Sequence, residues 1–165
     1  MTADKPTDRP KRIYIKPSPT ANTRACDWSK VSKDQLLVSS IQHKSDISQA
    51  LSLFAGMLMD AAVRHDFDKL TAIDHFHADF RTGFKATGWW DEHRKINRHH
   101  LMEADGIPED VNLVDVLDFI GDCVMAGLAR SGSVYELKLP DELLQRAFQN
   151  TVRLLIDSTE VSDAD

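Results

Sequence analysis

Apolar residues recur at steps of three and four positions from Lys33 onward, which is the spacing of a helix face that packs against a core. This spacing predicts helices at about residues 33–43 and 46–64. Asp66–Lys69 follows the second helix and is expected to form a short corner. The first half of the chain is therefore predicted to be helical.

Turn and capping residues predict further helices. Thr71 with Asp74 three residues later resembles a capping box, which would open a helix through Phe80. Another helix is expected over residues 90–103, because the turn Gly106-Ile107-Pro108 would stop it.

The second half of the chain repeats the helical pattern. Asn112 can cap a helix whose apolar stripe runs from Leu113 to Leu128, and a last helix is expected at about 141–156. Only residues 134–138 look extended. The predicted fold class is therefore all-α, with one helical bundle over residues 31–158.

The N-terminal stretch, residues 1–30, has a different composition. It carries seven Lys or Arg residues, three Asp and four of the six prolines, which predicts an extended basic arm. Residues 12–15 could still dock as a short edge strand. The arm can be a flexible leader, or it can embrace a neighbouring subunit or an acidic partner. Residues 159–165 are read as an acidic tail.

Composition and charge exclude several classes of protein. The 165 residues suffice for one packed domain, and the net charge of -6 argues against general nucleic-acid binding. Cys26 and Cys123 can form neither a thiolate zinc site nor a disulfide framework. No apolar run approaches the ~20 residues that a membrane span needs. We expect a soluble, cytoplasmic protein.

All seven histidines lie between positions 43 and 100, which favours a site. His65-Asp66 follows an apolar helix, and an imidazole next to a carboxylate suits metal binding. Inward-facing His and Asp side chains on neighbouring helices build the metal sites of helical bundles. The alternative is that these residues are hydrogen-bonded core or surface side chains. His75 and His77 are read as surface residues.

The order His43, His65-Asp66, His93, His100, Asp122 resembles the HD-domain metal-dependent phosphohydrolase superfamily, in its branch with six protein ligands and two metals. Within it, the string from His65 to Lys69 resembles the His-Asp-x-x-Lys signature of that branch. Residues 90–100 and 118–122 are similar to an uncharacterised family of small bacterial and phage proteins. The resemblance covers about residues 35–130.

The resemblance implies an HD-like helical fold and two divalent transition metals, such as Mn or Fe. The first would be held by His43, His65, Asp66 and Asp122, and the second by Asp66, His93 and His100. Asp66 would bridge the two ions and, with Lys69 on a phosphate oxygen, carry the catalytic role. His99 competes with His100 as the ligand.

Other residues near these ligands have supporting roles in this interpretation. Asp118 can accept the second ring proton of a ligating histidine, and Asn97 and His99 are placed behind the ligands. Two tryptophans could stack a nucleobase, and two arginines could pair with its phosphate. These residues are Trp89, Trp90, Arg94 and Arg98. The competing interpretation is that the tryptophans fill the core and the basic side chains face water.

The leading functional hypothesis is a metal-dependent phosphohydrolase for a nucleotide or another small phosphate ester. If the protein is phage-encoded, it would act in the host cytoplasm. One alternative is an HD-type di-iron oxygenase, because His and carboxylate ligands also accept iron. The other is a non-catalytic helical interaction protein with a retained metal site. The basic arm could join subunits of a homo-oligomer.

Overall fold

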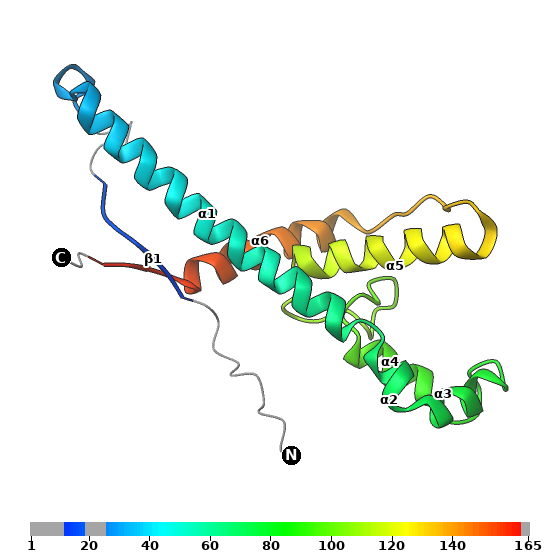
Figure 1. Ribbon diagram of the computed structural model, residues 1–165. Coiled ribbons are helices and arrows are strands. Elements are labelled where there is room, and N and C mark those ends of the chain that lie inside the picture. Colours follow the sequence, from blue (N-terminus) through cyan, green and yellow to red (C-terminus); the bar gives the residue numbers. More distant parts are fainter. Residues whose placement is uncertain (1–11, 19–25, 163–165) are drawn as a thin grey trace, which may run out of the picture. The chain divides into compact units, whose positions relative to one another are not determined.

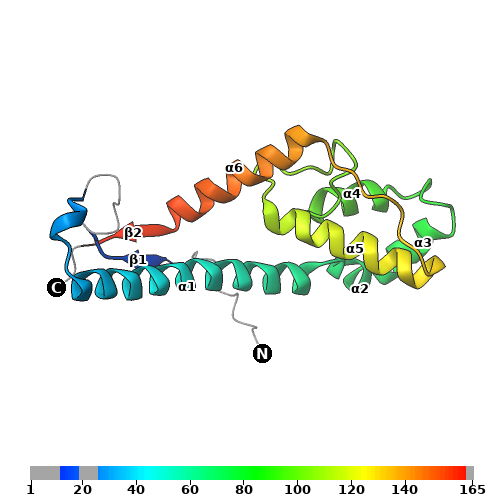
Figure 2. The same cartoon turned by 90° about the horizontal axis from the view of Figure 1, so that it is seen from above.

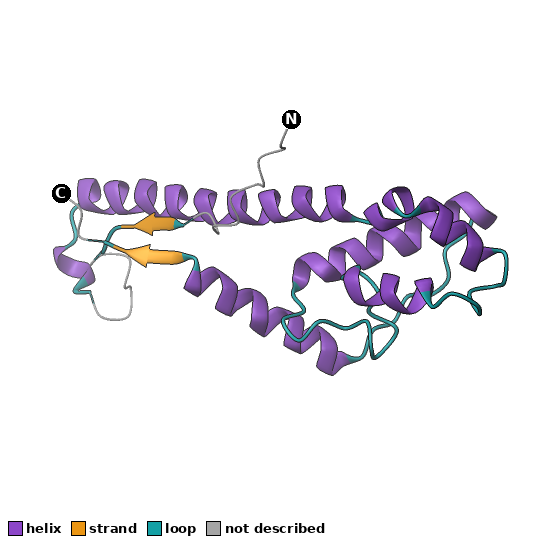
Figure 3. Ribbon diagram, turned by 90° about the horizontal axis from the view of Figure 1, so that it is seen from below, coloured by secondary structure: helices purple, strands orange, loops and turns teal. Residues whose placement is uncertain are grey.

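The computed structural model describes residues 12–18 and 26–162 (Figure 1). Most of them are helical, and the strands among them are two of three residues each (Figure 3). The predicted all-α class is confirmed. The chain divides into two compact units, one within Met1–Phe54 and Arg153–Asp165 and the other Ala55–Val152. None of the described helices combines the length and apolar character that a membrane span requires.

The first unit contains a two-stranded parallel sheet of β1 (Ile13–Ile15) and β2 (Thr159–Val161), which lie side by side in Figure 2. Ile13 pairs with Thr159. The edge strand expected at residues 12–15 is therefore present. The interpretation of residues 159–165 as a tail needs correction, because 159–161 form its partner strand. The remaining parts of the predicted arm and tail, 1–11, 19–25 and 163–165, lie outside the described residues.

A single long helix, α1 (Lys33–Arg64), replaces the two helices expected from the sequence (Figure 1). The expected break near residues 44 and 45 is absent because Lys44 and Ser45 lower the apolar content of the helix without interrupting its backbone. The hydroxyl of Ser48 donates to the carbonyl of Lys44 at 2.9 Å, within the helix. In the first unit, Gln49 of α1 donates to the carbonyl of Tyr14 in β1 at 3.2 Å.

The second unit holds three short helices, α2 (Phe67–Thr71), α3 (Ile73–Phe80) and α4 (Trp89–Ile96). Two longer helices follow, α5 (Leu113–Ser131) and α6 (Asp141–Asp157), of which α6 continues into the first unit. The buried apolar cluster of this unit joins α5, the start of α6 and the segment before α5. Its members are Leu101, Val111, Val116, Phe119, Leu143 and Ala147.

Helix capping follows the sequence at α5 and departs from it at α3. Asn112 and Asp115 form a reciprocal capping box, in which each side chain accepts a backbone N–H, at 2.9 and 2.8 Å. The capping box expected at Thr71 and Asp74 is wrong, because α3 starts after Ala72 without a side-chain cap. The hydroxyl of Thr71 instead donates to the carbonyl of Phe67 at 3.2 Å, as part of α2.

Helix α4 ends at Ile96, although the sequence predicted a helix through residue 103. Asn97 has extended backbone angles, φ -98° and ψ 109°, and its side-chain amide donates to the carbonyl of His93 at 3.0 Å. The backbone N–H of Asn97 donates to the same carbonyl at 3.0 Å, so the last helical bond is made and the extended backbone of Asn97 then ends the helix. His93 and His100 therefore do not share a helix face, and His99 and His100 lie in the turns that follow α4.

A buried carboxylate fixes the start of α4. Asp79 of α3 is fully buried and accepts the backbone N–H groups of Ala86, Thr87 and Trp90 at 3.2, 2.8 and 3.2 Å. Burial would raise the pKa of Asp79, but these backbone bonds outweigh it and lower the pKa below its ordinary value. Asp79 thereby positions the helix that carries His93.

Candidate metal centre

The centre is built on the corner that follows α1. Asp66 adopts a left-handed backbone conformation, φ 53° and ψ 19°, which Asp tolerates better than most residues. The corner turns the chain from α1 into α2 between Asp66 and Phe67. As a result the adjacent side chains of His65 and Asp66 converge, with His65 Nε2 3.5 Å from Asp66 Oδ2.

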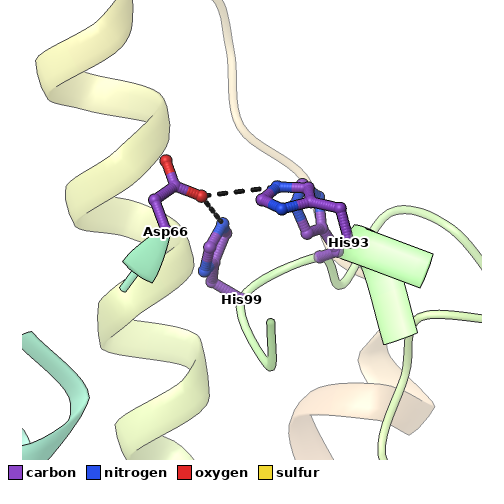
Figure 4. A group of neighbouring side chains, drawn as sticks. Asp66, His93 and His99 are labelled. Atoms are coloured by element: carbon purple, nitrogen blue, oxygen red, sulfur yellow. Dashed lines mark ion pairs between the residues drawn. The ribbon is translucent and has the colours of Figure 1, made fainter. Parts of the chain in front are cut away.

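The two carboxylate oxygens of Asp66 face different groups. Oδ1 lies 3.3 Å from His93 Nε2 and 3.6 Å from His99 Nε2. Figure 4 marks these two ion pairs by dashed lines. Oδ2 faces His65 Nε2 and accepts from the ammonium of Lys69 at 2.5 Å. One carboxylate therefore faces His93 and His99 with one oxygen and His65 with the other.

His93 is held in place by a carboxylate that the sequence analysis missed. Its Nδ1 lies 2.7 Å from Asp68 Oδ2, which leaves Nε2 directed at Asp66. Asn97 ties this arrangement together, because its amide donates to Asp68 at 2.9 Å while its carbonyl oxygen accepts the N–H of Asp66 at 3.1 Å. The only sequence signal for Asp68 is a second acid within the predicted corner.

His65 has the same arrangement on the other side. Its Nδ1 lies 2.8 Å from Asp118 Oδ1, the role that the sequence suggested for this acid. The Nε2 of His65 is 3.8 Å from Asp122 Oδ1. A carboxylate on one ring nitrogen fixes the orientation of the ring and leaves the other nitrogen for a ligand.

His99 and His100 both lie at the centre. Three overlapping groups of His and Asp residues occur here, and within each group the potential ligand atoms lie within 4.8 Å of one another. The groups are Asp66, His93, His99 and His100; His65, His99 and Asp118; and His65, Asp66 and Asp122. These His and Asp groups are compatible with a metal site. His99 is 2% exposed, so it belongs to the interior of the centre.

Three buried polar atoms of this centre lack a hydrogen-bond partner among the described residues: Asp66 Oδ1, His93 Nε2 and His100 Nε2. Buried polar atoms without partners are rare, because each costs desolvation free energy of about 1–3 kcal/mol. A bound cation would satisfy all three atoms. The donor set, imidazole nitrogen and carboxylate oxygen, suits divalent transition metals.

His93 and His100 are poised as neutral ligands. Burial lowers the pKa of His93, although Asp68 opposes this effect. Burial, together with the positive charge that His99 and His93 can carry, lowers the pKa of His100 to about 4. Near neutral pH these rings therefore keep a nitrogen lone pair available for a metal.

His43 is not among the residues that gather at this centre, contrary to the sequence expectation. It is on the first-unit part of α1, exposed, at a cavity that Ile13 and Asp46 also line. The centre belongs to the second unit. The sequence order suggested a ligand, but His43 is in none of the groups of potential ligand atoms.

The proposed nucleotide patch is also not assembled. Trp89 is 4% exposed and packs between Phe76 and His93, with both ring centroids 4.5 Å from its own. Trp90 packs near His93 and His100, at 5.3 and 5.2 Å. Both tryptophans therefore lie against histidines of the centre. The competing interpretation, that the tryptophans fill the core, fits the buried Trp89.

Arg94 and Arg98 are engaged by carboxylates. Arg94 bonds Asp91 at 2.6 Å and Asp105 at 2.9 Å. Arg98 forms a two-pronged pair with the buried Asp115 at 2.7 and 2.8 Å, which raises the pKa of Arg98. Neither guanidinium is free to hold a substrate phosphate. Asp91 is three positions from Arg94, but Asp105 and Asp115 lie 11 and 17 positions from their partners, so no local pattern indicated these two pairs.

Comparison with known proteins adds no relative: no family model, no curated protein and no solved structure matches the chain.

Proposed function

We propose that the centre binds two divalent transition-metal ions. The first is held by His65, Asp66 and Asp122, and the second by Asp66, His93, His99 and His100. The observation that carries this proposal is that the two oxygens of Asp66 face different histidine groups, as a bridging carboxylate requires. The unpartnered buried atoms of the second group support it further.

We propose that the reaction is hydrolysis of a small phosphate ester. Two bound divalent ions would activate water for attack on phosphorus and stabilise the charge that develops on the phosphate oxygens. Asp118 and Asp68 hold the histidine rings in orientation. Lys69 is the cation nearest the centre, and its ammonium can move from Asp66 to a phosphate oxygen.

A nucleotide substrate loses support, because Trp89 is buried and both arginines are paired. The same observation is compatible with a second candidate function, an O₂-dependent oxidation on the same ligands, since neither this reaction nor hydrolysis of a small ester needs a base-stacking patch. A non-catalytic interaction protein that retains a bound metal is the third reading.

One experiment separates these functions. Metal-depleted protein is reconstituted with Mn²⁺ or Fe²⁺, its metal content is measured, and phosphate release from small esters is followed under strict anaerobiosis. His93→Ala should lose metal and activity, whereas His75→Ala, an exposed histidine in the same unit, should keep both. Activity only with Fe²⁺ and O₂ would establish the oxidation instead. Bound metal without either activity would favour the interaction protein.

A further inference from the structure

A groove of about 480 Å³ in the second unit lies between the end of α1 and one face of α5. Leu58, Ala62 and His65 line it from α1. From α5 it is lined by Leu117, Gly121, Asp122 and Met125, among others. The groove therefore shares His65 and Asp122 with the proposed metal centre.

The groove meets the more accessible side of the centre. The side chains of His65 and Asp122 are 27% and 35% exposed, whereas those of His93 and His99 are 0% and 2% exposed. A molecule from solvent can therefore reach the centre past His65 and Asp122. The lining of the groove is consequently the surface that a substrate body would touch.

The chemistry of the lining restricts that body. Its polar members, His65, Asp118 and Asp122, belong to the centre, and the other lining side chains are aliphatic, Met or Gly. Among the described residues that line it, none is Lys, Arg, Phe, Tyr or Trp. A polyanionic or planar aromatic body would find neither a counter-charge nor a stacking face there.

We propose that the groove binds the aliphatic body of an alkyl phosphate, whose single phosphate group would be held by the metal ion proposed at His65, Asp66 and Asp122. This inference rests on the proposed function for the phosphate end and on the groove lining for the body. An aliphatic chain is complementary to Leu58, Leu117 and Met125, because contact removes apolar surface of both partners from water.

Gly121 offers a direct way to fill the groove. A Cβ built at Gly121 meets no heavy atom within 4 Å, so a side chain can start from this position without a clash at Cβ. Gly121 lies inside α5, where a residue other than Gly favours the helix. Gly121→Leu should therefore fold. Gly56→Leu is the matched control, because Gly56 of α1 is equally open and does not line the groove.

The test follows phosphate release by Mn²⁺-loaded protein from alkyl phosphates with chains from methyl to hexyl. For the protein without substitutions, we expect kcat/KM to rise by about fourfold for each methylene of the substrate that enters the groove. Gly121→Leu should abolish most of this rise, so that its hexyl-to-methyl ratio approaches one. Gly56→Leu should keep the natural ratio.

Several outcomes would overturn the inference while the proposed function stands. These are phosphate release that does not depend on chain length, an unchanged ratio in Gly121→Leu, or a preference for adenosine monophosphate over hexyl phosphate. A dimer that dissociates in Gly121→Leu, with the ratio unchanged, would show by light scattering that a second copy of the chain covers the groove.

Failure of the proposed function is distinguishable, because no ester, methyl phosphate included, would then release phosphate. In that case titration calorimetry of the metal-loaded protein with alkylphosphonates, which resist hydrolysis, tests the groove by itself. Affinity that rises with chain length and falls in Gly121→Leu would support the inference. Affinity independent of chain length would refute it.

Discussion

The two sides of the metal centre use the same arrangement in different surroundings. On one side, His93 is fully buried and its Nδ1 is held by Asp68. On the other, His65 is 27% exposed and its Nδ1 is held by Asp118. Each ring presents Nε2 to Asp66. The two histidines are therefore oriented in the same way, but only His65 is accessible to solvent.

This difference assigns different tasks to the two sides. The unpartnered nitrogens of His93 and His100 are buried away from bulk solvent, so a cation gains more by binding there. His65 and Asp122 retain contact with solvent, so their side can exchange a water for a substrate oxygen. We expect the buried side to hold its metal more tightly and the open side to meet the substrate.

The largest effect is expected from Asp66, which both sides share. Asp66→Ala should empty both metal sites, because each loses its common carboxylate, and plasma mass spectrometry of reconstituted protein should find less than about one tenth of the natural metal content. Asp66→Asn is the control for the backbone, since Asn tolerates the left-handed conformation at this position. Full metal content in Asp66→Ala would end the two-metal hypothesis.

The second prediction compares the two orienting carboxylates. Asp68→Asn and Asp118→Asn should each weaken metal affinity by roughly 10- to 100-fold, because the histidine loses its charged hydrogen-bond acceptor. Competition with a coloured chelator measures both. The loss should be larger for Asp68, whose histidine is buried and has no solvent to replace the bond. Equal losses would mean that burial does not distinguish the two sides.

The fold was predicted best where local signals suffice. Helix α5 carries its own cap and apolar stripe, so Asn112 marks its start both in sequence and in structure. The sequence did not indicate the early end of α4 at Asn97, whose side chain bonds Asp68, 29 positions away. A bond of that range leaves no local pattern.

The sequence predicted which residues belong to the candidate site better than it predicted how they are arranged. The sequence order drew attention to His65, Asp66 and His93, which converge, but also to His43, which lies in the other unit. Asp68 was missed because it acts on a residue 25 positions away. Residue types thus indicated the chemistry, whereas tertiary contacts decided which side chains take part.

The third prediction concerns the support of the buried side. Asp79→Asn should lower the melting temperature by roughly 5 °C at pH 7, because it weakens the bonds that hold the start of α4. The folded-state pKa of Asp79 is below its ordinary value of 3.8, so its stabilising contribution is present above about pH 4 and is lost as the pH falls through the lower folded value.

Unfolding in urea across pH 2–7 checks this sign. The free energy of unfolding of the natural chain should fall as the pH drops below about 4, and Asp79→Asn should fall less over the same range. Asp74→Asn, an exposed acid on the same helix, is the control and should keep the natural pH dependence. A steeper acid loss in Asp79→Asn would contradict the assigned role.

The smallest effect on the centre is expected from Arg98, which ties the segment carrying His99 to Asp115 at the start of α5. Arg98→Ala leaves the 6% exposed Asp115 without this partner, which should cost about 2 kcal/mol of unfolding free energy in urea. The value is below that of a fully buried pair because Arg98 itself is 40% exposed.

If Arg98 serves structure alone, metal content and KM should change by less than about twofold. Arg98→Lys is the matched variant, since it keeps the charge but loses the two-pronged geometry. A large rise of KM in both variants, with unchanged stability, would show that Arg98 binds the substrate and would support the nucleotide hypothesis.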